Sequence, residues 1–190
     1  MVNTELRPKI KKAKRVTGET LTFRNIECSD AEFILSLRTD ENKSRYLSLT
    51  NNDLKEQFSW LETYAVDDSQ AYFIIEFNND PIGCVRLYDA KGDSFCWGSW
   101  ILKDGRPRQA AIESALMVYA YAVDHLGFKS CHFDVRKENV GVLRFHEKFD
   151  AVRVGETNLD YFFNLSLQAI RNAQRKFSKF LPSGVTVNFI

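Results

Sequence analysis

The chain has 190 residues, 44% of them hydrophobic and 15 of them phenylalanine, which suits one domain with a substantial core. The formal net charge of +1 gives no overall reason to expect nucleic-acid binding, and no stretch approaches the ~20 apolar residues of a membrane span. The first residues lack the apolar core of a secretory signal, and none of the four cysteines forms a C-x-x-C pair. We therefore expect a cytoplasmic protein with reduced thiols, no metal site and no membrane partner.

Apolar residues that alternate with polar ones, or that recur at the 3.6-residue period, mark the predicted elements. Ser29-Asp30 is an N-cap signal for the first helix, residues 78–81 form a turn signal between two strands, and Gly127 ends the longest helix. In chain order we predict strand 20–26, helix 31–37, a turn or extended piece at 46–49, helix 53–65, strands 70–77, 82–88 and 94–102, helix 109–126, strand 129–135, helix 139–149, strands 152–154 and 161–167, helix 168–181 and strand 185–190.

This order predicts a single α/β (α+β) domain, with a mixed central sheet flanked by helices, over residues 19–168. Residues 169–190 carry a helix with one apolar face, which we expect to pack on the domain; a membrane-surface helix or a partner site is the alternative. Residues 1–15 hold six of the 26 Lys and Arg but one of the 25 Asp and Glu. We therefore predict a flexible basic arm over residues 1–18, a solvated tail in preference to an arm for nucleic acid or an acidic partner.

The strand 94–102, the loop after it and the longest helix form one unit that can bind an anion. A helix start carries a partial positive charge and unpaired N–H groups, both of which favour phosphate. Arg106 and Arg108 add two cations, and the small Ala110 and Ala111 let a ligand approach the backbone. We predict a pyrophosphate site over residues 105–111, with a solvated basic turn as the alternative.

A second polar junction leads from the strand 129–135 into the helix 139–149. Asn139 lies at this junction, where it either caps the helix or faces a ligand. His146 lies on the helix and is either a chemical group or an ordinary residue of an amphipathic face.

Taken together, these segments resemble the GNAT superfamily of acetyl-CoA-dependent N-acetyltransferases, with its ribosomal-protein and amino-sugar branches the most similar. The resemblance covers residues 21–167, and the order of the motifs is more specific than any one motif. It rests on the segments 95–101, 105–116, 132–139 and 145–149, with Glu113-Ser114-Ala115-Leu116 similar to the family's glutamate-alanine-leucine helix segment. It implies an N-acetyltransferase with acetyl-CoA as co-substrate.

The resemblance also implies where the co-substrate binds. The family's Arg/Gln-x-x-Gly-x-Gly/Ala loop matches Arg106, Gln109 and Ala111, and Gln109 replaces the usual glycine. Gln109 either crowds the pyrophosphate or donates a hydrogen bond to it. The implied cofactor-binding residues are Ile101, Leu102 and Lys103 for pantetheine, Arg106, Arg108, Gln109, Ala110 and Ala111 for pyrophosphate, and Asn139, which matches a family asparagine that often faces the cofactor.

Transfer of an acetyl group needs a neutral amine, donors for the oxyanion and an acid or dipole for the leaving thiolate. His146 takes the position of a family tyrosine that protonates the thiolate, a role that its ordinary pKa of ~6.5 allows; packing or substrate contact is the alternative. Cys96 stands where relatives often carry a glutamate base. Asp134 and His132 share one face of their strand, so they either relay the proton or form a structural pair. We expect Glu113 to be structural.

Aromatic residues are candidates for the acceptor pocket, because aromatic faces suit sugar rings or an aminoacyl group. No long acidic patch suits a basic peptide, which favours a small amine such as the amino group of a nucleotide-linked sugar. A protein N-terminal acetyltransferase and a non-catalytic acyl-CoA-binding module are the alternatives, and a homodimer is compatible with the sequence. The candidate acceptor residues are Tyr46, Trp97 and Trp100, with Trp60 and Tyr88.

Overall fold

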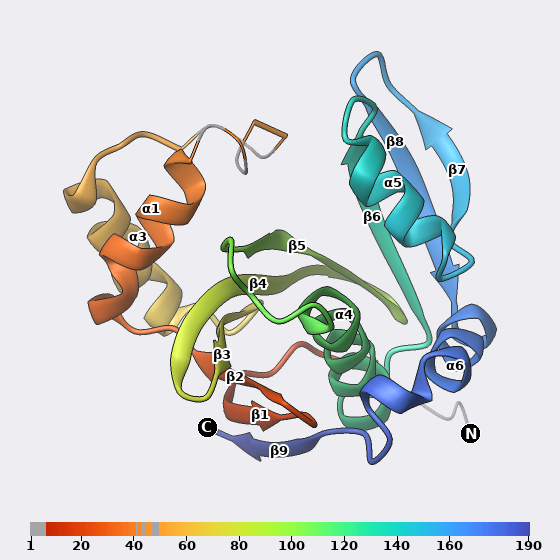
Figure 1. Ribbon diagram of the computed structural model, residues 1–190. Helices are drawn as coiled ribbons and strands as arrows, with labels where there is room; N and C mark the ends of the chain where they lie inside the picture. Colours follow the sequence, from red (N-terminus) through yellow and green to blue (C-terminus); the bar gives the residue numbers. More distant parts are fainter. Residues whose placement is uncertain (1–6, 41, 43–44, 47–49) are drawn as a thin grey trace, which may run out of the picture.

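One sheet organises the chain in a computed structural model that describes residues 7–40, 42, 45–46 and 50–190. Over these residues nine strands pair in the order β7-β8-β6-β5-β4-β3-β2-β1-β9 (Figure 1). Every pair is antiparallel except the parallel pair β5–β6, so the sheet is mixed, as predicted. The strands are β1 (Ala13–Thr17), β2 (Leu21–Asn25), β3 (Ala71–Phe77), β4 (Asp80–Lys91), β5 (Ser94–Leu102), β6 (Ser130–Arg136), β7 (Val152–Glu156), β8 (Asp160–Ser166) and β9 (Thr186–Phe189).

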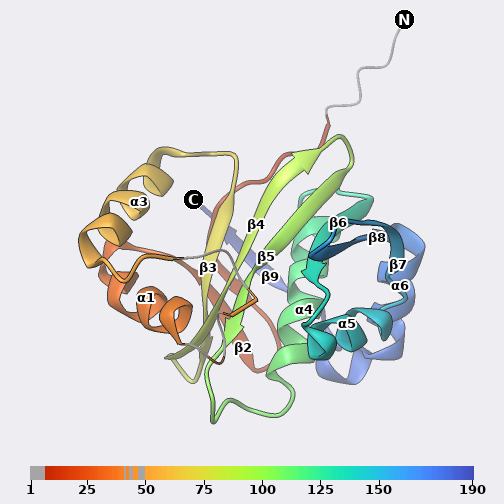
Figure 2. The same cartoon turned by 90° about the horizontal axis from the view of Figure 1, so that it is seen from above.

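Helices cover both faces of this sheet, and each side has its own buried apolar cluster (Figure 2). On one side α1 and α3 pack over Ile74 and Ile101, and on the other α4, α5 and α6 pack over Phe95 and Phe133. This three-layer arrangement is the predicted fold class. The helices are α1 (Ala31–Thr39), α3 (Leu54–Val66), α4 (Ala110–Ala120), α5 (Val140–Glu147) and α6 (Leu167–Lys176), with short helical turns at Cys28–Asp30, Tyr121–His125 and Ser178–Phe180.

The parallel pair β5–β6 is joined only at its beginning. Ser94 pairs with Ser130 and Phe95 with Cys131, after which the two strands diverge (Figure 1). A bulge follows within β5, because Gly98 and Ile101, three residues apart, face residues of β4 that are two apart. Ser99, inside the bulge, has a φ of 47°, in the left-handed region. The later part of β5 therefore has an edge that β6 does not cover.

The long helix after β5 is more deeply buried than its predicted apolar stripe requires. The α-helical part ends at Ala120, and one π-helical turn, Tyr121–His125, continues it toward the predicted stop at Gly127, whose φ is 83°. All residues of α4 from Glu113 to Ala120 are buried. The reason is that α4 has the sheet on one side and α6 on another, so its second face is covered as well.

The flexible basic arm predicted over residues 1–18 is wrong for its second half. Ala13–Thr17 form β1, which pairs with β2 on one side and β9 on the other, and Ala13 and Val16 are fully buried. The basic Lys14 and Arg15 lie exposed between these two buried residues, and Lys12 Nζ donates to the carbonyl of Tyr64 at 2.5 Å. Residues 1–6 lie outside the described residues, as do residues 47–49 of the piece predicted at 46–49.

The C-terminal helix α6 lies against the domain. Ile170 and Ala173 are buried in the main core, and Arg171 Nη1 is 2.5 Å from the carboxylate of Asp124 at the end of the long helix. Beyond α6, β9 pairs with β1 and is the edge strand on that side of the sheet. Within the described part of the chain no helix is long and apolar enough to cross a membrane.

Candidate active site

The bend between β5 and α4, residues 103–109, is open to solvent in the way an anion site requires. Arg106 and Arg108 are exposed, and Arg106 Nη1 donates to the carbonyl of Lys103 at 3.2 Å. Gln109 is the N-cap residue of α4, yet its side chain makes no capping hydrogen bond. The N–H of Ala110 donates to the carbonyl of Pro107 at 3.0 Å, but no side-chain cap occupies the N–H groups that follow it in the first turn, and two guanidinium groups stand beside them. This donor set fits a diphosphate.

The divergent edge of β5 leads from this bend toward the interior. Only Ser94 and Phe95 pair with β6, so the backbone from the bulge to Leu102 is open on that side. Lys103 differs from its neighbours, because its N–H donates to the carbonyl of Ile82 at 2.8 Å and is used within the sheet. The open edge of an extended strand fits an elongated amide-bearing arm such as pantetheine.

A pocket of about 290 Å³ opens between the bulge of β5, the end of β6 and the start of α5. It brings together seven residues that the sequence singled out from five separate segments. Arg38, from α1, completes one of its walls. The seven predicted residues that line it are Tyr46, Tyr88, Trp97, Trp100, Asp134, Asn139 and His146.

His146 is buried in an aromatic environment, with 5% of its surface exposed. Its ring centroid lies 4.2 Å from that of Phe133 and 5.5 Å from that of Trp97, and its Nδ1 has no hydrogen-bond partner. Burial lowers the pKa of His146 to about 3. The imidazole is therefore neutral near pH 7. The predicted role of His146 as the acid that protonates the thiolate assumed an ordinary histidine pKa, and that assumption does not hold here. A neutral ring still offers one N–H group as a hydrogen-bond donor.

The two other predicted catalytic residues do not share one environment. Asp134 lines the pocket, and its pKa is raised, first by burial and then by the nearby carboxylate of Asp160. His132 does not line it: its Nδ1 is 2.7 Å from the hydroxyl of Ser94, and its Nε2 is 3.4 Å from Asp89. The structure thus brings Asp134 to the site and engages His132 with other partners.

Asn139 has the capping role that the sequence offered and also lines the pocket, while its contact with a ligand stays a prediction. Its Oδ1 accepts from the N–H of Val142 at 3.3 Å and so caps α5, and the residue also lines the pocket. Trp100 also has a structural contact and a place in the pocket wall, since its Nε1 donates to the hydroxyl of Ser114 at 3.1 Å while the residue lines the pocket. Both residues are fixed by the fold before any ligand arrives.

Glu113 is structural, as expected. It is fully buried in α4, and its carboxylate accepts from the N–H and hydroxyl of Thr20 at 2.6 and 2.5 Å and from the N–H of Leu21 at 2.9 Å. These bonds fix the start of β2 to α4, away from the acceptor pocket.

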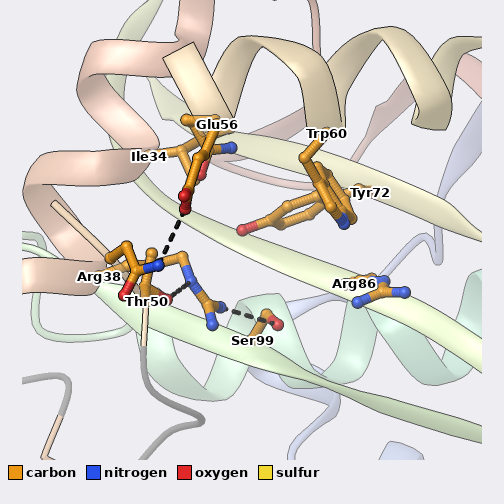
Figure 3. A pocket seen from close by; sticks show the side chains of 10 residues that line it. Ile34, Arg38, Thr50, Glu56, Trp60, Tyr72, Arg86 and Ser99 are labelled. Atoms are coloured by element: carbon orange, nitrogen blue, oxygen red, sulfur yellow. Dashed lines mark hydrogen bonds between the residues drawn. The ribbon is translucent and has the colours of Figure 1, made fainter. Parts of the chain in front are cut away.

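A second, larger pocket of about 420 Å³ adjoins the first and was missed by sequence reasoning, apart from Trp60 (Figure 3). Helices α1 and α3 form one wall and strands β3, β4 and β5 the other; Arg38 and Ser99 line both pockets. The available signal was Arg86, the charged residue in the otherwise apolar strand segment 82–88. Its lining residues are Ile34, Arg38, Thr50, Asn51, Glu56, Gln57, Trp60, Tyr72, Arg86 and Ser99.

A parallel strand pair that splays beside a helix N-terminus, with a pocket at the splay, is the arrangement that the resemblance to acetyl-CoA-dependent N-acetyltransferases led us to expect. The sequence model described as "Acetyltransferase (GNAT) domain" matches residues 20–152. The chain therefore belongs to the GNAT family of acetyltransferases, enzymes that use acetyl-CoA as co-substrate.

Solved structures agree with this assignment. One described as "Apo FdhC- a nucleotide-linked sugar GNAT" is 36% identical, with a TM-score of 0.79 over 88% of this chain and 98% of that one. A GCN5-related N-acetyltransferase from Brucella melitensis has 16% identity and a TM-score of 0.77 over 94% and 90%. The spermidine N-acetyltransferase from Vibrio cholerae in complex with CoA and spermine has 18% identity and a TM-score of 0.71 over 80% and 99%. The last two show a shared fold alone. A comparison with curated proteins gives no significant match.

Proposed function

We propose that the enzyme moves the acetyl group of acetyl-CoA to a primary amine on a sugar that is linked to a nucleotide. The observation that carries the proposal is the 36% identity to a nucleotide-linked sugar GNAT over nearly the whole of both chains. The pocket supports it, since four aromatic residues line it and aromatic side chains suit contact with a sugar ring; they are Tyr46, Tyr88, Trp97 and Trp100.

In this proposal the co-substrate lies along the open edge of β5. Its diphosphate would meet the N-terminus of α4 with Arg106, Arg108 and the backbone of Gln109, Ala110 and Ala111. Its pantetheine arm would follow the backbone of Ile101 and Leu102, where β6 has diverged. When bound, acetyl-CoA supplies an activated thioester carbonyl at the inner end of this path, which is the pocket of His146.

Asp134 is the base of the proposed reaction. Its raised pKa makes it a better proton acceptor than an ordinary carboxylate, and it lines the same pocket as His146. It would take the proton that the ammonium group must lose before its nitrogen forms the bond to carbon. As the carbon–sulfur bond breaks, the neutral N–H of His146 would stabilise the negative charge by a hydrogen bond. The nitrogen loses its second proton to solvent as the amide forms, and a proton from solvent completes the thiol.

The acceptor class is tested by offering purified enzyme and acetyl-CoA a panel of amines and following release of free CoA. The panel holds nucleotide-linked amino sugars, the same amino sugars without the nucleotide, spermidine and peptides with free N-termini. We expect the highest kcat/KM for a nucleotide-linked amino sugar. Turnover of spermidine or peptides with none of the sugars would overturn the proposal.

A further inference from the structure

The larger pocket contains a cation that the acetyl-transfer chemistry leaves unused. Arg86 extends from β4 into this pocket (Figure 3). Within the described part of the chain Arg86 forms no ion pair, and its buried Nε has no hydrogen-bond partner. The guanidinium carbon lies 5.4 Å from the ring centroid of Trp60 and 4.8 Å from that of Tyr88. Two aromatic rings therefore hold a half-buried cation that has no ion-pair partner among the residues the structure describes.

A second guanidinium faces the same space. Arg38 reaches from α1 to β5, donating from Nε to the hydroxyl of Thr50 at 2.7 Å and from Nη1 to the hydroxyl of Ser99 at 3.3 Å (Figure 3). Burial, with a smaller contribution from the charge of Arg38, lowers the pKa of Arg86. A ligand with more than one negative charge can contact both guanidinium groups of this one pocket.

The rest of the wall suits a flat, polar ring. Trp60 and Tyr72 meet edge to face with centroids 5.7 Å apart, and the amide of Gln57 is buried on the same side. An amide offers both a donor and an acceptor, as the edge of a nucleobase requires. The acidic residue of the lining, Glu56, is exposed and accepts from Asn51 Nδ2 at 3.0 Å, so its charge is solvated.

The order of these groups matches the order of parts in one class of molecule. Arg38 and Ser99 line both pockets, so they stand between the site of Asp134 and His146 and the aromatic wall of the larger pocket. In a nucleotide-linked sugar the diphosphate stands between the sugar and the base. Resting on the proposed function, we infer that the larger pocket binds the nucleoside diphosphate of the acceptor, with its phosphates on Arg38 and Arg86 and its base against Trp60 and Tyr72.

The decisive variant is Arg86→Gln, which removes the charge and keeps most of the side chain's length. We expect the KM for a nucleotide-linked amino sugar to rise about 10- to 100-fold, because a hydrogen bond to a charged group contributes about that factor. The kcat and the KM for acetyl-CoA should change less than twofold. Arg86→Lys should recover part of the loss. Arg175→Gln, an exposed arginine on α6, is the matched control and should behave as wild type.

Two further measurements separate this inference from the proposed function. The same amino sugar without its nucleotide should have an equal kcat/KM with wild type and Arg86→Gln. By calorimetry, uridine or thymidine diphosphate should bind wild type in the presence of CoA and bind Arg86→Gln at least tenfold more weakly. If nucleotide-linked amino sugars are acetylated but Arg86→Gln leaves their KM and diphosphate binding unchanged, the inference fails and the proposed function stands. If no amino sugar is a substrate, the proposed function fails, and equal diphosphate binding by both proteins would sink the inference as well.

Discussion

Replacement of His146 by phenylalanine should change how the stability of the protein depends on pH. In the folded protein the pKa of His146 is about 3, whereas an unfolded chain restores the ordinary value of 6.5. Between these values the unfolded state binds a proton that the folded state does not. The contribution of His146 to the free energy of unfolding is therefore fully present above pH 6.5. It is lost as the pH falls toward 3, because the unfolded state then binds a proton that the folded state does not.

The size of this effect follows from the two pKa values. At pH 5 the unfolded histidine is about 97% protonated, and its contribution lowers the free energy of unfolding by about 2 kcal/mol relative to pH 7. Below pH 3 the loss approaches about 5 kcal/mol, the equivalent of the full pKa difference. Phenylalanine has no proton to bind and keeps the contacts with the rings of Phe133 and Trp97, so the variant should lack this component.

The assay is urea unfolding of wild type and His146→Phe at pH 7, 6 and 5, with linear extrapolation to water. We expect wild type to lose about 2 kcal/mol more than the variant between pH 7 and pH 5. His125→Phe, which removes an exposed histidine, is the control and should follow wild type. If the free energy of unfolding changed equally with pH in wild type and His146→Phe, the reasoning would be refuted, because His146 would then have the same pKa in the folded and unfolded states.

Three other changes test the packing and the chemistry. Glu113→Ala should lower the free energy of unfolding by about 2–3 kcal/mol, since it leaves the donors of Thr20 and Leu21 without their acceptor, and urea unfolding against the exposed control Glu138→Ala measures it. Asp134→Asn should lower kcat about 10²- to 10⁴-fold with little change in the KM for acetyl-CoA. It should also remove the acidic limb of the pH–rate profile, which in wild type should lie above the usual carboxyl range because the pKa of Asp134 is raised. An unchanged limb would exclude Asp134 as the base. Gly83→Ala would place its Cβ 2.2 Å from the carbonyl oxygen of Ile101, so a fall in Tm equivalent to about 3 kcal/mol is expected in thermal unfolding.

Most elements of the fold could be predicted because their signals are local. The 3.6-residue stripe of α4 and the glycine stop at Gly127 are visible within one segment, and the structure places the helix there. Strand β1 was missed because its basic residues dominate the composition of Ala13–Thr17, while the burial of Ala13 and Val16 depends on pairing with β2 and with β9 at the far end of the chain. Nothing within that segment shows that two partners will cover it.

The candidate site likewise has features that could be predicted from the sequence and features that could not. Asp134 and Asn139 could be found because they stand at a strand–helix junction, and His146 because it lies on the helix that follows, in segments that resemble the family pattern. The neutral state of His146 could not be predicted, since it depends on Phe133 and Trp97, which come from two other strands. The larger pocket was missed for a similar reason, because its cations and rings come from α1, α3 and three strands that only the folded sheet brings together.

The bulge in β5 connects the two halves of the proposed reaction. The hydroxyl of Ser99 accepts from Arg38, which lines both pockets, while its carbonyl accepts from the thiol of Cys84 at 3.3 Å on the neighbouring strand. A strand has a side-chain period of two, so the one extra residue in the bulge decides which face Trp100 occupies and thus whether its ring can line the pocket. Without that residue Trp100 would exchange faces with its neighbours. The same local irregularity therefore shapes the pocket where the acetyl group is transferred and positions the arginine that we assign to the phosphates of the acceptor.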